Sequence, residues 1–242
     1  MRKLVLFDID GTLLWTDGAG RRAIRQALLD EMGTAGPIEA YRFGGKTDPQ
    51  IVRELMTAAD HPHATSPEHL DLVCRRYLTL LAAELERNAG ATRLLAGVAA
   101  LLDALESRGD AVIGLLTGNL EVGAALKLRA AGLDPARFRV GAFGSDAADR
   151  PDLPPIAVRR ARDTIGCDVA GHDVVIIGDT PADMTCGRSI GARAIGVATG
   201  FFSIGALLEA GAYAAFASLA DVGAVLGAIY DHTEAAAPAA HS

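Results

Sequence analysis

Five short apolar segments recur along the chain, and each leads into a polar or glycine-rich turn. They comprise residues 3–7, 111–119, 138–146, 174–180 and 192–200. Because the runs are apolar at successive positions, they are typical of parallel strands that helices cover on both faces. Helical patterns lie between them, as over residues 98–109, where Gly109 is well placed to end the helix. The alternation predicts an α/β fold with an open parallel sheet.

A long helical insertion interrupts this alternation after the first segment. Asp8 and Thr117 are 109 positions apart, whereas a strand, its crossover helix and the next strand need only about 30 residues. Helical patterns fill the interval over residues 20–33, 49–60 and 67–88, the last with Ser66 as its cap and Pro67 at its first position. We therefore expect a discontinuous α/β core of residues 1–15 and 91–225, an all-helical cap domain of residues 16–90, and a C-terminal segment, residues 226–242, with a flexible tail.

Composition and charge exclude several classes of function. The 242 residues are 50% hydrophobic, enough for a substantial core. A net charge of -7, with basic residues grouped only in pairs such as Arg21–Arg22, argues against a nucleic-acid partner. Asp8 and Asp10 interrupt the first apolar run too early for a secretion signal, and no uninterrupted apolar stretch of about 18 residues follows. Three widely spaced cysteines fit reduced thiols. We expect a soluble, cytoplasmic protein with no membrane partner.

Acidic and hydroxyl side chains follow three of the predicted strands. Ligands of an open parallel sheet bind beyond the carboxyl ends of its strands. There the sequence places one group of polar residues that should meet in a crevice: Asp8 and Asp10, then Thr117, Gly118 and Asn119, then Asp179 and Asp183. Carboxylates this close raise one another's pKa or share a cation. Oxygen-only ligands suit Mg²⁺, which also takes waters and a substrate phosphate.

These residue types can divide the work of phosphoryl transfer. Asp8 can attack phosphorus as a carboxylate nucleophile and form an aspartyl-phosphate, and Asp10 can serve as general acid and then general base. Phosphoryl transfer also calls for a cation besides the metal, and we choose Arg150, which lies just ahead of a helical pattern. The phosphate-binding set that we predict is Gly11, Thr12, Thr117, Gly118, Asn119 and Arg150.

The order of these motifs resembles a known superfamily. DIDGT, a threonine that closes a strand, a basic residue before a helix, and GDTPAD occur in that order. They are similar to the four motifs of the haloacid dehalogenase-like hydrolases, and the position of the insertion resembles the helical cap of the phosphoglycolate phosphatase-like branch. The resemblance implies a Rossmann-like core and an Mg²⁺ site formed by Asp8, the carbonyl of Asp10, and Asp179, with Asp183 as a further acidic member.

Two departures from the family pattern carry information. Members that dehalogenate haloacids lack the second aspartate, and phosphonoacetaldehyde hydrolases typically have a small residue there, so the resemblance together with Asp10 implies phosphate ester chemistry. The third motif is usually lysine, whereas this chain offers Arg150, with Arg159 and Arg160 as poorer candidates. Arginine keeps the charge but presents it in a planar fork with a different reach.

Several alternatives stay open at this point. FGGKTD, residues 43–48, has Ala40 where a phosphate-binding loop needs glycine and no strand before it, so we interpret it as a bend that presents Lys46 to a substrate's anionic group. A receiver module would carry its phosphoryl acceptor on a later strand and would lack the insertion. The favoured prediction is an Mg²⁺-dependent phosphatase of small phosphorylated metabolites, such as phosphoglycolate or a sugar phosphate. A phosphomutase of the same family and a non-catalytic phosphate- or nucleotide-binding protein are the alternatives, and the oligomeric state is not predicted.

Overall fold

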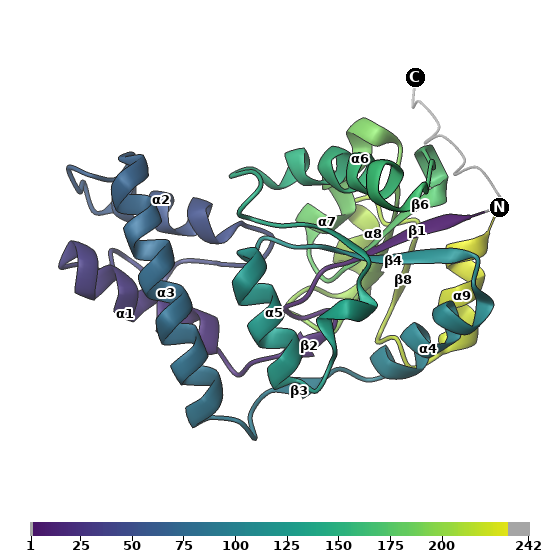
Figure 1. The fold of residues 1–242 in the computed structure, drawn as a ribbon, viewed down its shortest axis with the longest axis horizontal. Helices are drawn as coiled ribbons and strands as arrows, with labels where there is room; N and C mark the ends of the chain where they lie inside the picture. Colours follow the sequence, from purple (N-terminus) through teal and green to yellow (C-terminus); the bar gives the residue numbers. More distant parts are fainter. Residues whose placement is uncertain (1, 232–242) are drawn as a thin grey trace.

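A six-stranded parallel sheet lies at the centre of the computed structural model, which describes residues 2–231. Within the described residues its spatial order is β5-β4-β1-β6-β7-β8, with β1 in the interior (Figure 1). The strands are β1 (Lys3–Phe7), β4 (Ala111–Leu116), β5 (Val140–Ala142), β6 (Val174–Gly178), β7 (Arg193–Val197) and β8 (Ala214–Phe216). The predicted open parallel sheet is therefore confirmed.

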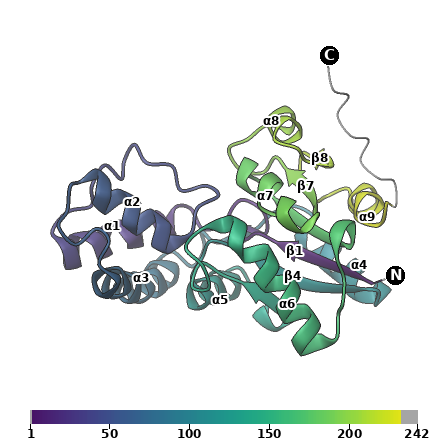
Figure 2. The ribbon, with the colours of Figure 1, turned by 90° about the horizontal axis from the view of Figure 1, so that it is seen from above.

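Helices cover both faces of the sheet, as the continuous apolar strands require (Figure 2). The helices α4 (Val98–Arg108), α5 (Glu121–Ala130) and α9 (Val222–Tyr230) contribute to the apolar cluster that contains Val5 and Phe7. The helices α6 (Leu153–Ile165) and α7 (Pro181–Cys186) contribute to the cluster on the other face, which contains Leu4 and Leu6. The short α8 (Ile204–Glu209) packs beside β7 and β8. Alternate side chains of β1 thus enter opposite layers of the core.

Strand register brings the candidate residues to one edge of the sheet. Phe7, the last residue of β1, pairs with Leu115 of β4 on one side and Ile177 of β6 on the other. The residues that follow each strand therefore leave the sheet at the same level. This shared level places Asp8, Thr117 and Asp179 together, although they are far apart in the sequence.

The inserted segment forms a separate group of helices beside that edge (Figures 1 and 2). We call α1 (Ala19–Met32), α2 (Asp48–Ala58) and α3 (Pro67–Arg87) the helical module. It has its own apolar cluster, with Ile24, Leu55 and Leu81 almost completely buried. Leu120, next to α5, also belongs to that cluster, so the module packs directly against the core.

Several details differ from the expectations drawn from sequence. The edge strand β8 was not predicted, because it is only three residues long. The chain leaves the core near β2 (Leu14–Trp15) and returns to it near β3 (Arg93–Leu94). These two short strands pair with each other as a two-stranded antiparallel sheet. The hydroxyl of Ser66 lies 2.9 Å from His69 Nδ1 and makes no side-chain capping bond. By contrast, the predicted end of α4 agrees with the structure, where Gly109 is the C-cap and has a φ of 70°.

The C-terminal boundary also differs from the expected one. Helix α9 continues past residue 225 to Tyr230, and both Val225 and Ile229 are buried against the core. The expected flexible tail falls mostly on residues 232–242, which lie outside the described residues. Among the described helices, none combines the length and the apolar character needed to cross a bilayer.

Candidate active site

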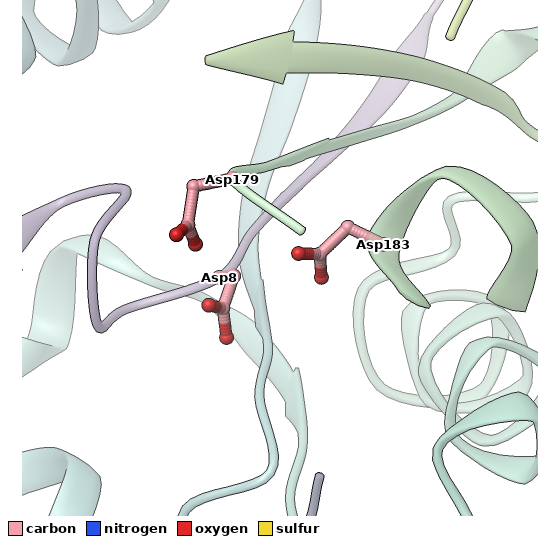
Figure 3. Close-up of side chains that lie close together, drawn as sticks. All are labelled: Asp8, Asp179 and Asp183. Atoms are coloured by element: carbon pink, nitrogen blue, oxygen red, sulfur yellow. The ribbon is translucent and has the colours of Figure 1, made fainter. Parts of the chain in front are cut away.

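Three carboxylates meet at the carboxyl edge of the sheet (Figure 3). Asp8 follows β1, Asp179 follows β6, and Asp183 lies in the first turn of α7. One oxygen from each lies within 4.8 Å of the others, and all three residues are buried. This cluster joins two of the predicted motifs and has the all-oxygen donor set that suits a hard divalent cation.

The cluster carries more negative charge than its surroundings neutralise. Burial, followed by repulsion from Asp183 and Asp8, raises the pKa of Asp179 from 3.8 to about 9. Burial also raises the pKa of Asp8 to about 6, although the Arg150 guanidinium opposes this rise. Because a cation between the carboxylates would relieve both the repulsion and the desolvation cost, the residues present fit a divalent metal.

Arg150 is the one of the three arginine candidates that enters the cluster. It lies in a short 3-10 turn, Arg150–Asp152, directly before α6, and is only 4% exposed. Its Nη2 lies 3.1 Å from Asp8 Oδ1, also donates to Asp183 Oδ1, and lies 3.3 Å from the carbonyl of Leu116. Its Nε is buried and has no hydrogen-bond partner among the described residues.

The other two arginines point elsewhere. Arg160 donates to both carboxylate oxygens of Asp146 at 2.6 Å and to the carbonyl of Gly141. Arg159 is exposed. Of these three arginines, Arg150 alone lies between two acids of the cluster.

The turn after Asp10 is held tightly against Asp179. Gly11 has a φ of 81°, and a Cβ at this position would lie 2.5 Å from Asp179 Oδ2. Thr12 is buried, and its hydroxyl donates to Asp179 Oδ1 at 3.3 Å. In the loop after β7, a Cβ on Gly200 would lie 1.8 Å from the same carboxylate. A Cβ at position 11 or 200 would therefore displace the Asp179 carboxylate, and the backbone conformation of Gly11 also favours glycine.

Asp183 has a structural role in addition to its place in the cluster. Its Oδ2 accepts bonds from the backbone N–H and the hydroxyl of Thr180, at 3.0 and 2.6 Å, which completes the capping box of α7. The side chain is completely buried. The capping interaction fixes one oxygen, which leaves the other for Arg150 and the cluster.

A second polar network surrounds the carboxylate of Asp10. Asn119 Nδ2 donates to Asp10 Oδ2 and to Thr117 Oγ1, each at 2.8 Å. Lys127 Nζ lies 2.6 Å from both Asp10 Oδ2 and Asn119 Oδ1. The carboxylate of Asp10 is not part of the three-acid cluster, so the two aspartates of DIDGT face different partners.

The helical module contacts the core beside the site through the N-terminus of α2. The backbone N–H of Asp48 donates to the carbonyl of Gly118 at 2.8 Å, and Asp48 Oδ2 accepts from the N–H of Leu120 at 2.9 Å. Thr47 donates to the carbonyl of Ala148 at 2.6 Å. A Cβ on Gly118 would lie 2.0 Å from the Lys46 carbonyl, so only glycine permits this approach.

The core and the helical module enclose a cavity of about 730 Å³. Its lining includes predicted site residues from both parts of the chain: Asp8, Asp10, Lys46, Thr117, Gly118, Asn119, Arg150 and Asp179. Lys46 belongs to this lining, but its ammonium group pairs with Glu54 Oε2 at 2.6 Å and with the Tyr41 hydroxyl at 2.8 Å. Burial raises the pKa of Glu54, but hydrogen bonds from Lys46, Tyr41 and Gln50 outweigh this and lower it to about 2.

Sequence reasoning missed Lys127, Asp48 and Tyr77. Lys127 and Tyr77 are buried in helices, where a single polar residue gives no motif to recognise. Their positions at the cavity depend on how α3 packs against α5, which is a tertiary contact between distant segments. Asp48 lay within a segment that we interpreted as a bend, and its carboxylate contacts the core instead of solvent.

Comparison with known proteins agrees with this arrangement. Residues 2–191 match the sequence family described as haloacid dehalogenase-like hydrolase. The chain belongs to this family. No curated protein is similar enough in sequence to count as a match. The family assignment explains why the four ordered motifs and the parallel sheet occur together in this hydrolase.

Solved structures share the fold over nearly the whole chain. A variant of CbbY from Rhodobacter sphaeroides, in complex with xylulose-(1,5)bisphosphate, has a TM-score of 0.74 and 23% identity, covering 92% of this chain and 97% of its own. A predicted phosphoglycolate phosphatase from Haemophilus somnus has a TM-score of 0.68 and 19% identity, with coverage of 93% and 98%. A putative β-phosphoglucomutase from Thermotoga maritima has a TM-score of 0.61 and 23% identity, with the same coverage.

Proposed function

We propose that this hydrolase is an Mg²⁺-dependent phosphatase of small phosphorylated metabolites that works through an aspartyl-phosphate on Asp8. The observation that carries the proposal is the meeting of Asp8, Asp179 and Asp183 around one space, with Arg150 beside them. This arrangement combines a nucleophile, a candidate metal site and a fixed cation. Those are the groups that phosphoryl transfer needs.

The guanidinium of Arg150 supports binding of an oxyanion. Its Nη2 lies 3.1 Å from Asp8 Oδ1, and the residue lines the cavity. A phosphoryl oxygen beside this fixed positive charge would place phosphorus near Asp8. Thr117 and the backbone around Gly118 and Asn119 line the same part of the cavity and supply further donors.

The two aspartates take different roles in this proposal. Asp8 attacks phosphorus, the bond from phosphorus to the leaving oxygen breaks, and Asp10 gives that oxygen a proton. Asp10 then accepts a proton from the water that attacks the aspartyl-phosphate, which releases inorganic phosphate and restores Asp8. The bonds from Asn119 and Lys127 keep the carboxylate of Asp10 out of the acidic cluster and at the cavity, where a leaving group would lie.

Mg²⁺ would be held by Asp8, Asp179 and Asp183, with the carbonyl of Asp10 as a further ligand implied by the family. When bound, it supplies positive charge that screens the attacking carboxylate from the phosphoryl oxygens. Burial and repulsion between neighbouring acids raise the pKa values of Asp8 and Asp179, and a bound cation would oppose both effects. We infer Mg²⁺ rather than a softer metal because the donors are oxygens only.

The cap side of the cavity also carries positive charge. Lys46 is paired with Glu54, whereas Arg21 donates to the carbonyls of Ile38 and Tyr41, which do not neutralise its charge. Arg42 is exposed and belongs to the lining of the cavity. These cations suit a second anionic group of the substrate, such as the carboxylate of phosphoglycolate, and a phosphomutase of the same family stays the alternative to the phosphatase.

A phosphate-release screen over a metabolite panel tests the proposal. We expect turnover of one or more phosphate monoesters with Mg²⁺ and little turnover after chelation. Asp8→Asn should abolish release while the far-ultraviolet circular dichroism spectrum stays unchanged. Full activity in Asp8→Asn would overturn the nucleophile assignment, and a panel without turnover would favour a non-catalytic phosphate-binding protein.

A further inference from the structure

Lys127 occupies an unusual position for a lysine. It lies in the middle of α5, is 4% exposed, and directs its ammonium group to the edge of the sheet where the cavity lies. Burying an ammonium group is costly unless it is paired and hydrogen-bonded. A lysine at a buried helical position therefore needs a reason, and none of the family motifs discussed above includes this residue.

The contacts of Lys127 converge on one carboxylate oxygen. Its Nζ lies 2.6 Å from Asp10 Oδ2 and 2.6 Å from Asn119 Oδ1. Asn119 in turn donates to the same Asp10 Oδ2 at 2.8 Å, so the three side chains form a closed triangle. Lys127 orients the amide of Asn119 by donating to its oxygen, and both side chains then hold Asp10 from two directions. Asp10 Oδ1 has no partner in this triangle.

The surroundings of Lys127 favour a precise position over a mobile one. Gly20 of α1 passes so close that a Cβ on it would lie 3.5 Å from Lys127 Nζ and 3.8 Å from the Tyr77 hydroxyl. Tyr77 is 1% exposed and its hydroxyl makes no hydrogen bond within the described residues. Helices of the module thus pack around the ammonium group, and its range of movement is small.

We infer that Lys127 is a positioning residue that fixes the carboxylate of Asp10 in the orientation needed for proton transfer to the leaving group. By holding Oδ2, Lys127 and Asn119 leave Oδ1 to face the reacting oxygen. They also prevent the carboxylate from turning into the cluster of Asp8, Asp179 and Asp183. The inference rests on the proposed function, since it assigns how the proposed acid/base residue is aimed.

The dependence on leaving group tests this role. kcat/KM reports steps up to departure of the leaving group, and a poorly basic leaving group such as p-nitrophenolate needs little help from an acid. Lys127→Met should lower kcat/KM about 10-fold or more for an alkyl phosphate, a part of the 10²–10⁴-fold typical of general acid–base catalysis. The loss should be clearly smaller for p-nitrophenyl phosphate. Arg129→Met, an exposed position on the same helix, is the matched control and should leave both values unchanged.

A double-variant cycle separates positioning from a structural effect. On an Asp10→Asn background, Lys127→Met should cause no further loss of kcat/KM for the alkyl phosphate, because the group it positions is already gone. Equal losses for both substrates, or a full further loss on that background, would overturn the inference. If Lys127→Met does not fold, Lys127→Arg serves in its place, since a planar guanidinium cannot reproduce both short contacts, and the same pattern is expected.

A structural readout separates this inference from the proposed function. If the wild-type protein turns over no phosphate ester, the proposed function fails, and crystal structures of wild type and Lys127→Met then decide about Lys127. We expect Asp10 to lose its contact with Asn119 in the variant. An unchanged Asp10 orientation in the variant would overturn the positioning role.

Discussion

Replacing Arg150 by alanine should damage both stability and catalysis, because its guanidinium lies between two buried acids. Nη2 is 3.1 Å from Asp8 Oδ1 and in direct contact with Asp183, and the side chain is 5% exposed. Removing one partner of a buried ion pair costs about 3–5 kcal/mol. We expect a loss of this size in the free energy of unfolding of the metal-free protein. Mg²⁺ should recover part of it by neutralising the same acids.

The effect of Arg150→Ala on rate should be large even where the variant is folded. Removing one fixed donor to a developing oxyanion costs about 10²–10³ in kcat. Without the guanidinium, the pKa of Asp8 should also rise above its value of about 6, which leaves less nucleophilic carboxylate at neutral pH.

Urea denaturation with and without Mg²⁺, combined with phosphate-release kinetics, measures both effects. Arg159→Ala is the control, because Arg159 is exposed on the following helix. Arg150→Lys keeps the charge and should retain more stability than Arg150→Ala. An Arg150→Ala variant with wild-type stability and rate, or an Arg159→Ala variant with the larger loss, would refute the placement of this cation in the site.

Two further predictions concern the contact with the helical module and the metal. Gly118→Ala should lower activity and destabilise the protein by about 1–3 kcal/mol through overpacking, because its Cβ would lie 2.0 Å from the Lys46 carbonyl. Thermal melts measure the change in stability. Gly227→Ala is the control: a Cβ there would have nothing within 4 Å, so this variant should be as stable as the wild type or more stable. The pKa of Asp179 is raised in the folded state to about 9, so the native protein binds this proton more tightly than the unfolded chain, and metal-free stability should fall as pH rises from about 4 towards 9. Mg²⁺ binding at pH 7 should release a proton, measured by calorimetry in buffers of different ionisation enthalpy, and binding without proton release would contradict the raised pKa.

The sequence was sufficient for the parts of the site that follow strands. Continuous apolar runs identify buried strands, and the carboxyl ends of parallel strands lie at a shared edge of the sheet. Asp8, Thr117 and Asp179 could therefore be placed together from the sequence alone. Arg150 was chosen from three arginines near the expected position, and its packing against Asp8 and Asp183 is what distinguishes it from the other two.

Contacts between the core and the inserted helices could not be predicted in the same way. In the sequence Lys127 resembles any surface lysine of a helix, and it becomes buried only because the helical module packs against α5. Lys46 lines the cavity, but its pairing with Glu54 depends on how two residues are placed within the folded module. The short strands β2, β3 and β8 carry too few residues for a periodic signal. In each case tertiary packing, rather than local pattern, sets the outcome.

Direct identification of the phosphorylated residue is the measurement that tests the central proposal most closely. The enzyme is mixed with a substrate and Mg²⁺, quenched in acid during the first turnovers, digested, and analysed by mass spectrometry. We predict a phosphoryl group on the peptide that contains Asp8 and no such group in Asp8→Asn. A phosphoryl group on another residue, or phosphate release by Asp8→Asn at the wild-type rate, would contradict the account.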